Sequence, residues 1–510
     1  MISTPSIVCP SPPAVNRAAV KSRDSENAAS PLPPWPISLL GVPFDNVTKA
    51  EAVLRMSAMI AARKPHYVVT ANVDFLVQAR HDVELRRILL EADLVLCDGT
   101  PLLWASRWLG NALPERAAGS DVVPLLIRAA AEKGHRIFLL GAGPNVAAEA
   151  AARLREQHPS LIIAGYYSPP FRTLLEMDFP EIERQLHAAR PDIVLVSFGC
   201  PKQEKWIAKH FHLLGVPVMI GVGATLDFIA GRIKRAPAFM QRTGTECLYR
   251  LAQEPRRLAR RYAGDLVHFA PALARQWWNL RRSVRLATTT EFIVSAQATD
   301  WRHFRIAGNF NAAALNSERD FFDDALETNQ HCRIDLSQVN FLDSTAVAVL
   351  VQWRRRLHVR GKRLLLLNPS VEVSSTLKLM RLTGHFASVV QPAETTITDD
   401  SLELGEPVVP PYPGGHTLAW QGEITAANAE AVGHSTRHHL TAVGAPPRQT
   451  FIINLSRLQF IDSAGVELMS HLRDWARKKE KEMRFLAPPP AVRNVLRLAE
   501  LDHLLETNHR

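Results

Sequence analysis

Residues 194–227, VLVSFGCPKQEKWIAKHFHLLGVPVMIGVGATLD, give the clearest indication of the fold of the first half of the chain. An apolar, β-branched run that begins at Ile193 and is broken at Gly199 predicts a strand. A helical pattern follows Pro201, and the apolar run Val218–Val222 predicts a second strand. Two strands that flank a helix within about thirty residues form a βαβ unit, so we expect them to be parallel. Both run into glycines at their carboxyl ends, where open α/β sheets bind ligands.

The same alternation of apolar runs and helical patterns extends over residues 37–231. Six runs predict strands: His66–Val69, Leu94–Cys97, Arg136–Leu140, Leu161–Ala164, Ile193–Phe198 and Val218–Val222. Helical patterns lie between them, for example over Val122–Lys133 and Asn145–His158. Strands that alternate with helices predict an α/β fold with a mainly parallel, Rossmann-like sheet.

Composition bounds the class of protein. The 510 residues are enough for about two to four domains, and a hydrophobic content of 46% allows a packed core. Five scattered cysteines without metal-ligand spacing indicate a reducing compartment. We find neither a signal-peptide pattern nor the apolar run of about 20 residues that spans a bilayer. The protein is therefore expected in the cytoplasm.

Positive charge is concentrated in one block. Residues 232–285 hold thirteen Lys and Arg against three acidic residues, an excess equal to the net charge of +10 of the whole chain. The block predicts an anionic partner, namely a membrane surface, a phosphate-rich ligand or nucleic acid. Its helical pattern carries Trp277 and Trp278, which favours a helix lying on the inner face of the membrane. The alternative is a solvated helix whose tryptophans pack on the domain.

The C-terminal part contains a repeat. RIDLSQVNFLDSTAVAVLVQWRRRL (333–357) aligns with IINLSRLQFIDSAGVELMSHLRDWA (452–476) at a constant offset of 119 residues. Each copy predicts a strand, an Asp-Ser turn, an amphipathic helix and a further strand, which indicates two copies of one small α/β domain. Residues 391–416, rich in acidic residues, proline and glycine, predict a linker. Residues 1–36, rich in Pro, Ser and Ala, predict disorder.

Ordered motifs over residues 37–265 resemble the WecG/TagA/CpsF glycosyltransferases, family 26. They are GVPFDNVT (41–48), TANVDF (70–75), ADLVLCDGTPL (92–102), PERAAGSDVVP (114–124), FLLGAGP (138–144), PDIVLVSFGCPKQEKWI (191–207), GVGATLDFIAGRIKRAP (221–237) and CLYRLAQEPRRLARRY (247–262). The repeats resemble STAS domains, the fold of anti-anti-sigma factors, through the core DLS-x-V-x-F-x-DS. The implied division is a transferase domain (37–235), a basic helical appendage (236–285) and two STAS-like domains (286–390 and 417–510).

The resemblance implies an inverting transfer of a sugar from a UDP-sugar to a lipid-pyrophosphate-linked saccharide at the cytoplasmic membrane face. It implies no metal and no other cofactor, and the first domain lacks an Asp-x-Asp motif. An inverting transfer needs a base for the acceptor hydroxyl. The family's (N/C)-x-D-G segment makes Asp98 the candidate. Without the resemblance, Asp98 would more simply cap the following helix.

The resemblance also implies binding residues near the strand ends. Thr70 and Asn72 match the family's T-x-N and are expected to hold sugar hydroxyls, although this composition also suits a turn and cap. Arg116 is expected to bind a diphosphate, because a guanidinium makes bidentate contacts with phosphate. Asp121, in the same motif, could equally cap a helix that starts at Val122.

Gln203 matches the family's PKQE and is expected to contact the donor or acceptor at a helix start, where backbone N–H groups face phosphate. Gly141 and Gly143 form a turn that lacks the third glycine of a dinucleotide fingerprint, so we expect a nucleotide-side loop and no NAD site. The uridine or sugar pocket is expected to include Gly221, Gly223 and Asp227, although Asp227 could be structural.

The basic appendage is expected, from the family, to help close the active site and to reach the membrane. Four of its arginines are candidates for the acceptor diphosphate, in no order of preference: Arg235, Arg242, Arg250 and Arg256.

STAS domains of the anti-anti-sigma type carry a kinase-target serine in the turn DS-x-G, which here is Ser344 or Ser463. Ala346 replaces the glycine in the first copy and Gly465 keeps it in the second, which favours Ser463. Phosphorylation there would change the binding of a protein partner. The alternatives are a plain helix-capping serine and a domain that only docks other proteins.

The leading hypothesis is a glycosyltransferase of exopolysaccharide or other surface-glycan biosynthesis, with the STAS domains for docking or regulation. N-acetylmannosamine, its uronic acid, glucose and glucuronic acid all remain open as the sugar. The second hypothesis is a regulatory scaffold with a vestigial transferase domain. Nucleic-acid binding ranks last, because the basic block lacks a recognised reader motif.

Overall fold

The computed structural model describes residues 34–243, 245–283, 291–295, 300–383, 385–389, 417–426, 428–442, 450–499, 501 and 505. The expected disorder over residues 1–36 and the expected linker over 391–416 fall, apart from 34–36, outside these residues.

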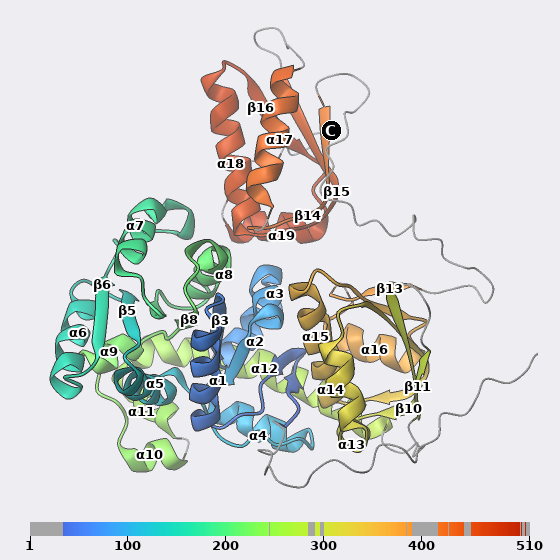
Figure 1. Ribbon diagram of the computed structural model, residues 1–510, viewed down its shortest axis with the longest axis horizontal. Coiled ribbons are helices and arrows are strands. Elements are labelled where there is room, and N and C mark those ends of the chain that lie inside the picture. The colour runs from blue at the N-terminus through green and yellow to red at the C-terminus, as the bar shows by residue number, and fades with distance from the viewer. Residues whose placement is uncertain are drawn as a thin grey trace, which may run out of the picture. The chain divides into compact units, whose positions relative to one another are not determined.

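The transferase part is built on a six-stranded sheet (Figure 1). Its strands are β3 (His66–Ala71), β4 (Leu94–Cys97), β5 (Arg136–Gly141), β6 (Ile162–Tyr167), β7 (Ile193–Ser197) and β8 (Val218–Gly221). They lie in the order β4-β3-β8-β7-β5-β6, and every pair is parallel. All six predicted strands and the predicted mainly parallel sheet are therefore confirmed. A short antiparallel pair, β1 (Ile37–Leu39) and β2 (Val42–Phe44), precedes them.

The strands bury side chains on both faces, as a parallel sheet covered on both sides requires. Val194 and Val196 belong to one apolar core, while Ile193 and Leu195 belong to the other. The first core includes α2 (Val73–Gln78), α3 (Val83–Glu91), α4 (Thr100–Trp108), α7 (Phe179–Ala189), α8 (Lys202–Leu214) and α12 (Pro255–Ser283). The second includes α1 (Lys49–Ala62), α5 (Gly119–Lys133), α6 (Val146–Gln157) and α9 (Thr225–Ile229). Parallel pairing brings the carboxyl ends of the strands to one edge.

The basic appendage forms α10 (Ala238–Thr243), α11 (Glu246–Gln253) and the 29-residue α12. Phe269 on α12 is buried in the transferase core, whereas Trp278 is 59% exposed. The helix therefore both packs on the domain and presents an aromatic side chain outward. Within the described ranges, none of the helices combines the length and the apolar character that crossing a bilayer requires.

The predicted repeat is confirmed, and three pairs of elements recur at the same offset. The first copy contains β11 (His331–Leu342), α15 (Ser344–Val359) and α16 (Val371–Leu379), and the second contains β15 (Thr450–Ile461), α18 (Ser463–Lys478) and α19 (Pro490–Leu498). Each pair starts and ends 119 residues apart. The first sheet has the order β13-β12-β11-β10-β9, with β9 (Glu291–Ser295), β10 (Trp301–Phe310), β12 (Leu364–Leu367) and β13 (Ala387–Val389). The second has the order β14-β15-β16, with β14 (Thr417–Ile424) and β16 (Glu482–Leu486).

The helices α13 (Ala312–Ser317), α14 (Arg319–Glu327) and α17 (Ala429–Ala442) complete the two copies. The structure of the Asp-Ser turns contradicts the alternative that their serines cap the helices. Asp343 and Asp462 are the helix caps, and their carboxylates accept hydrogen bonds from backbone N–H groups of the first turn. Ser344 and Ser463 are the first helical residues and are buried, so neither is a capping serine.

Candidate active site

A cavity of about 660 Å³ lies at the carboxyl edge of the six-stranded sheet. Five strand ends line it with Thr70, Asn72, Asp98, Gly99, Ala142, Ser197, Gly199, Val222, Gly223 and Thr225. The opposite wall comes from α11 and α12, with Glu246, Cys247, Arg250, Leu258, Arg261, Tyr262, Asp265, Leu266 and Phe269. The appendage thus closes a pocket whose floor is the sheet edge, which is where ligands bind in open α/β sheets.

Asp98 follows β4 directly and lines this cavity. Its backbone N–H donates to Ala71 O at 2.8 Å, which continues the strand pairing by one residue. Helix α4 is capped by Gly99 without any side-chain hydrogen bond, so the alternative that Asp98 caps it is wrong. Burial raises the pKa of Asp98 to about 6, against the opposing charges of Arg116 and Arg250. A carboxyl of that pKa is a stronger base than an exposed aspartate, yet is mostly ionised at neutral pH.

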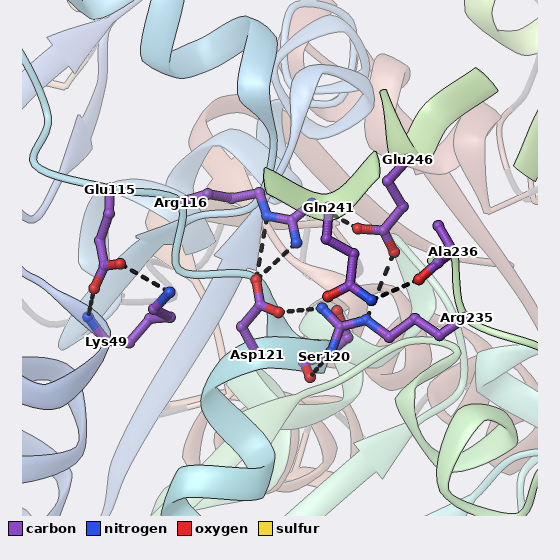
Figure 2. Close-up of polar contacts among 9 residues, drawn as sticks. All are labelled: Lys49, Glu115, Arg116, Ser120, Asp121, Arg235, Ala236, Gln241 and Glu246. Carbon is purple, nitrogen blue, oxygen red and sulfur yellow. Dashed lines mark hydrogen bonds and ion pairs between the residues drawn. The ribbon is translucent and has the colours of Figure 1, made fainter. Parts of the chain in front are cut away.

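Arg116 belongs to a network of two guanidinium groups and two carboxylates, shown in Figure 2. It donates to Asp121 Oδ2 at 2.8 Å and to Glu246 Oε2 at 2.7 Å. Arg235 contacts the same two carboxylates from the other side and donates to Ser120 O at 3.0 Å. The predicted phosphate ligand Arg116 is therefore paired with protein carboxylates, and a diphosphate would have to compete with Glu246 from α11.

The same network corrects the expectation for Asp121. Helix α5 begins at Gly119 after Ala118 and has no side-chain cap, so Asp121 is not a helix cap. Its carboxylate instead faces Arg116 and Arg235. Two charged guanidinium donors hold a carboxylate more strongly than a neutral backbone N–H does, which explains the difference.

The four candidate arginines of the appendage differ in their position relative to the cavity. Arg250 lines the cavity, and its guanidinium lies 5.7 Å from the centre of the Phe228 ring. Arg235 supports Asp121 outside the lining residues, and Arg256 is exposed on α12. The side chain of Arg242 lies outside the part of the chain that the structure describes. Arg250 is thus the member of this set best placed to meet an anionic ligand.

Thr70 and Asn72 both line the cavity, and each also makes a structural contact. Thr70 Oγ1 donates to Gly221 O at 3.0 Å, which joins the ends of β3 and β8. Asn72 caps α2 and accepts from Phe75 N, so the capping alternative is confirmed for this residue. Its side-chain nitrogen makes no hydrogen bond within the described residues and remains available to a sugar hydroxyl.

Gln203 is placed differently from the expectation. Its Oε1 accepts from Gly199 N at 3.1 Å and from Gly223 N at 3.2 Å, and its Nε2 donates to Glu204 Oε1 at 2.7 Å. The side chain reaches the cavity wall but is only 2% exposed. The amide that the resemblance assigns to substrate is therefore hydrogen-bonded to the protein at both ends.

Of the glycines expected in the binding site, some line the cavity and others lie behind its wall. Gly141 has φ of +102°, and a Cβ there would lie 2.6 Å from Ser197 O, so this turn needs glycine. The lining residue of the Gly141–Gly143 turn is Ala142, and Gly221 lies behind the wall against Gln203. Gly223 and Asp227 line the cavity as expected. Burial raises the pKa of Asp227, which is half-buried.

Several lining residues were not predicted from the sequence. Glu246 binds Arg116, and Arg261 joins Asp74 at 2.8 Å and Asp265 at 3.9 Å. Burial and then the charge of Asp74 raise the pKa of Asp265 to about 6. The sequence contained one indication of them. The basic block holds three acidic residues, and two of these, Glu246 and Asp265, line the cavity. Among the described residues, no group of three or more His, Cys, Asp and Glu side chains is arranged to hold a metal ion.

Comparison with known proteins agrees with this geometry. Residues 37–283 match the Glycosyl transferase WecG/TagA/CpsF family, residues 296–391 match the Mlab STAS domain, and residues 407–509 match the STAS domain. An N-acetylglucosaminyldiphosphoundecaprenol N-acetyl-beta-D-mannosaminyltransferase of Bacillus spizizenii (strain ATCC 23059 / NRRL B-14472 / W23) is 34% identical over 197 residues, which are 39% of this chain and 75% of that protein. The enzyme of the same name from Staphylococcus aureus (strain MW2) is 28% identical over 226 residues, 44% of this chain and 87% of its own. The chain therefore belongs to the WecG/TagA/CpsF glycosyltransferase family and carries two STAS domains behind the transferase.

Proposed function

We propose that the protein transfers an N-acetylhexosamine from a UDP-sugar to a polyprenyl-diphosphate-linked saccharide, with inversion and without a metal ion. The names of the relatives support this choice of sugar class and acceptor. The observation that carries the proposal is the position of Asp98, a carboxyl of raised pKa that lines the cavity together with Arg116 and Arg250.

The chemistry assigns each group a role. The acceptor oxygen attacks the anomeric carbon, the bond from that carbon to the UDP oxygen breaks, and Asp98 takes the proton of the attacking hydroxyl. Negative charge grows on the departing diphosphate, and cationic side chains such as Arg250 and Arg116 stabilise it. Thr70, Asn72, Gly223 and Asp227, which also line the cavity, would hold the donor sugar and nucleotide. In this scheme guanidinium groups supply the positive charge that stabilises the departing diphosphate.

The acceptor is lipid-linked, so we place the enzyme peripherally on the inner face of the membrane, in surface-glycan or exopolysaccharide biosynthesis. The basic appendage supports this, because α12 presents the exposed Arg256 and Trp278. The variant R256Q/W278S should bind anionic vesicles less than the wild type. Arg184→Gln, an exposed change on α7, is the control, and unchanged sedimentation of the double variant would contradict membrane binding by α12.

The domain division at residues 235, 285, 390 and 416 and the regulatory role of the STAS domains remain part of this proposal. Ser463, in the copy that keeps Gly465, is the preferred phosphorylation site over Ser344. Both serines are buried, so a kinase would reach them only after the turn becomes accessible.

The direct test is a panel of UDP-sugars with undecaprenyl-diphosphate-linked N-acetylglucosamine as acceptor. UDP-N-acetylmannosamine is the first donor to test, because of the names of the relatives. We expect transfer that persists in EDTA and gives a product of inverted configuration. No transfer with any donor of the panel would contradict the proposed function, and loss of activity in EDTA would contradict only its metal-free part.

A further inference from the structure

Two glycine turns form adjacent parts of the cavity wall, one after β7 at Gly199 and one after β8 at Gly223. Both glycines have positive φ, +79° and +51°, in the left-handed region that glycine adopts most readily. One side-chain oxygen, Gln203 Oε1, accepts the backbone N–H of both turns. Gln203 thus joins two strand ends that pairing of β7 with β8 alone would leave as separate loops.

Glu204 decides which way the Gln203 amide faces. Its Oε1 accepts from Gln203 Nε2, and the Glu204 side chain is only 1% exposed. A reversed amide would point Nε2 at two N–H donors and would lose both hydrogen bonds to the turns, and it would point Oε1 at a carboxyl oxygen. Leaving buried donors without acceptors is costly, so Glu204 holds the amide in the observed orientation.

The surroundings leave this pair little freedom. A Cβ at Gly221 would lie 2.7 Å from Gln203 Nε2 and 2.9 Å from Glu204 Oε1, so the strand backbone packs directly on both side chains. On the far side of the second turn, Ser197 Oγ donates to Gly223 O at 2.5 Å. The peptide groups of Gly223 are therefore held from both directions, by Gln203 and by the end of β7.

We propose that Gln203 and Glu204 form a positioning pair that holds the Gly199 and Gly223 turns in the shape the substrate needs, and that Gln203 does not itself bind substrate. The inference about substrate rests on the proposed function, whereas the inference about the turns does not. A ligand that used the Gln203 amide would have to break hydrogen bonds to two buried turns. The pair instead acts on substrate through Gly199 and Gly223, which do line the cavity.

The test exchanges the two side chains. Gln203→Glu alone sets two carboxyl groups against each other. In the double variant Q203E/E204Q, Glu at 203 still accepts from both glycines, and its second oxygen accepts from the new Gln at 204. Hydrogen exchange of peptides that contain Gly199 and Gly223 reports on the turns, and kcat/KM for UDP-sugar transfer reports on function.

We expect Gln203→Glu to speed exchange of both turns and lower kcat/KM about tenfold or more, as the loss of one buried hydrogen bond would. The double variant should return the hydrogen-exchange rate of both turns and kcat/KM to within about threefold of the wild type. Such a difference is smaller than about 1.4 kcal/mol, which corresponds to a factor of ten. If the double variant restores the hydrogen-exchange rate but not kcat/KM, substrate contacts the Gln203 amide and the proposal is wrong. If the single variant leaves the hydrogen-exchange rate unchanged, or the double variant fails to restore it, Gln203 and Glu204 do not hold the turns as a pair.

A matched control exists on α7, where Gln185 Nε2 donates to Glu181 Oε1 at 2.8 Å in a partly buried contact away from the cavity. The exchanged variant E181Q/Q185E and its single variants should leave the turns unchanged. If no donor supports transfer even in the wild type, the proposed function fails, and the exchange measurements still decide whether the pair holds the turns.

Discussion

The two sides of the cavity hold buried carboxyl groups in opposite surroundings. On the β4 side, burial raises the pKa of Asp98 to about 6, and Arg116 and Arg250 are the cations that act on it. On the β7–β8 side, burial raises the pKa of Glu204 to about 7, and the neighbour that most opposes this shift is the uncharged Gln203 amide. Desolvation is the largest cause in both cases.

Desolvation of a carboxyl group therefore occurs in two different structural roles. The β4 side contains ion pairs, such as Arg116 with Glu246, whose partners a charged substrate can exchange. On the β7–β8 side, Gln203 forms neutral hydrogen bonds to backbone groups, which a substrate could replace only by leaving buried donors unpaired. We therefore assign proton transfer and charge stabilisation to the first side and shape to the second.

Removal of the proposed base, Asp98, should have the strongest effect on activity. Asp98→Asn should lower kcat by about 10²–10⁴-fold, the usual contribution of a positioned general base, without changing the melting temperature appreciably. In the wild type, kcat/KM should rise with pH through about 6 as Asp98 loses its proton, and this limb should vanish in the variant. Full transfer by Asp98→Asn would show that the base lies elsewhere in the cavity.

The next effect tests the cation of the β4 side. Arg250→Gln should lower kcat/KM by about 10–100-fold, because it removes a charge-assisted contact to the diphosphate of about 1.5–3 kcal/mol. Arg260→Gln is the matched control, since this arginine is exposed on the same appendage and does not line the cavity. Equal losses in the two variants would mean that the appendage acts through its total charge and not through Arg250.

A smaller effect follows from weakening the ion-pair network. Glu246→Gln removes a carboxylate that competes with phosphate for Arg116, so KM for the diphosphate-linked substrate should fall about two- to fivefold, the scale of a partly exposed ion pair. Because the charge of Glu246 helps to raise the pKa of Asp98, the acidic limb of kcat/KM should also move to lower pH. Glu115→Gln is the control, because Glu115 pairs with Lys49 instead (Figure 2). An unshifted limb in Glu246→Gln would separate this carboxylate from the base.

The smallest effect concerns stability on the β7–β8 side. The pKa of Glu204 rises from an ordinary 4.5 to about 7 on folding, so the folded state prefers the protonated carboxyl. Its contribution to the free energy of unfolding is therefore full below pH 4.5 and is lost as the pH rises to about 7. Glutamine cannot ionise, so the melting temperature of Glu204→Gln relative to the wild type should increase by about 2–4 °C between pH 5 and pH 8. A difference that stays constant with pH would mean that Glu204 does not change its protonation in this range.

Local sequence patterns were sufficient to predict the strands of the sheet and the repeat. The six strands of the transferase sheet follow from continuous apolar runs that end at turns, because strand propensity and apolar character are properties of neighbouring residues. The repeat follows in the same way, from a constant offset of 119 residues that β11 and β15 reproduce. The motif that contains Asp98 placed a carboxyl after a strand, and parallel pairing carries such strand ends to one edge.

The partners of the polar side chains at that edge could not be predicted from local patterns. Arg116 pairs with Glu246, 130 residues away, and Asp121 pairs with Arg235, 114 residues away. Gln203 accepts a hydrogen bond from the backbone N–H of Gly223, which follows β8. Its position at a helix start had instead predicted a ligand contact. Which donors and acceptors find one another depends on distances between elements that local periodicity does not encode. Local sequence patterns therefore predicted the sheet, the repeat and the carboxyl at the strand end, whereas packing determines which side chains line the cavity and which support its wall.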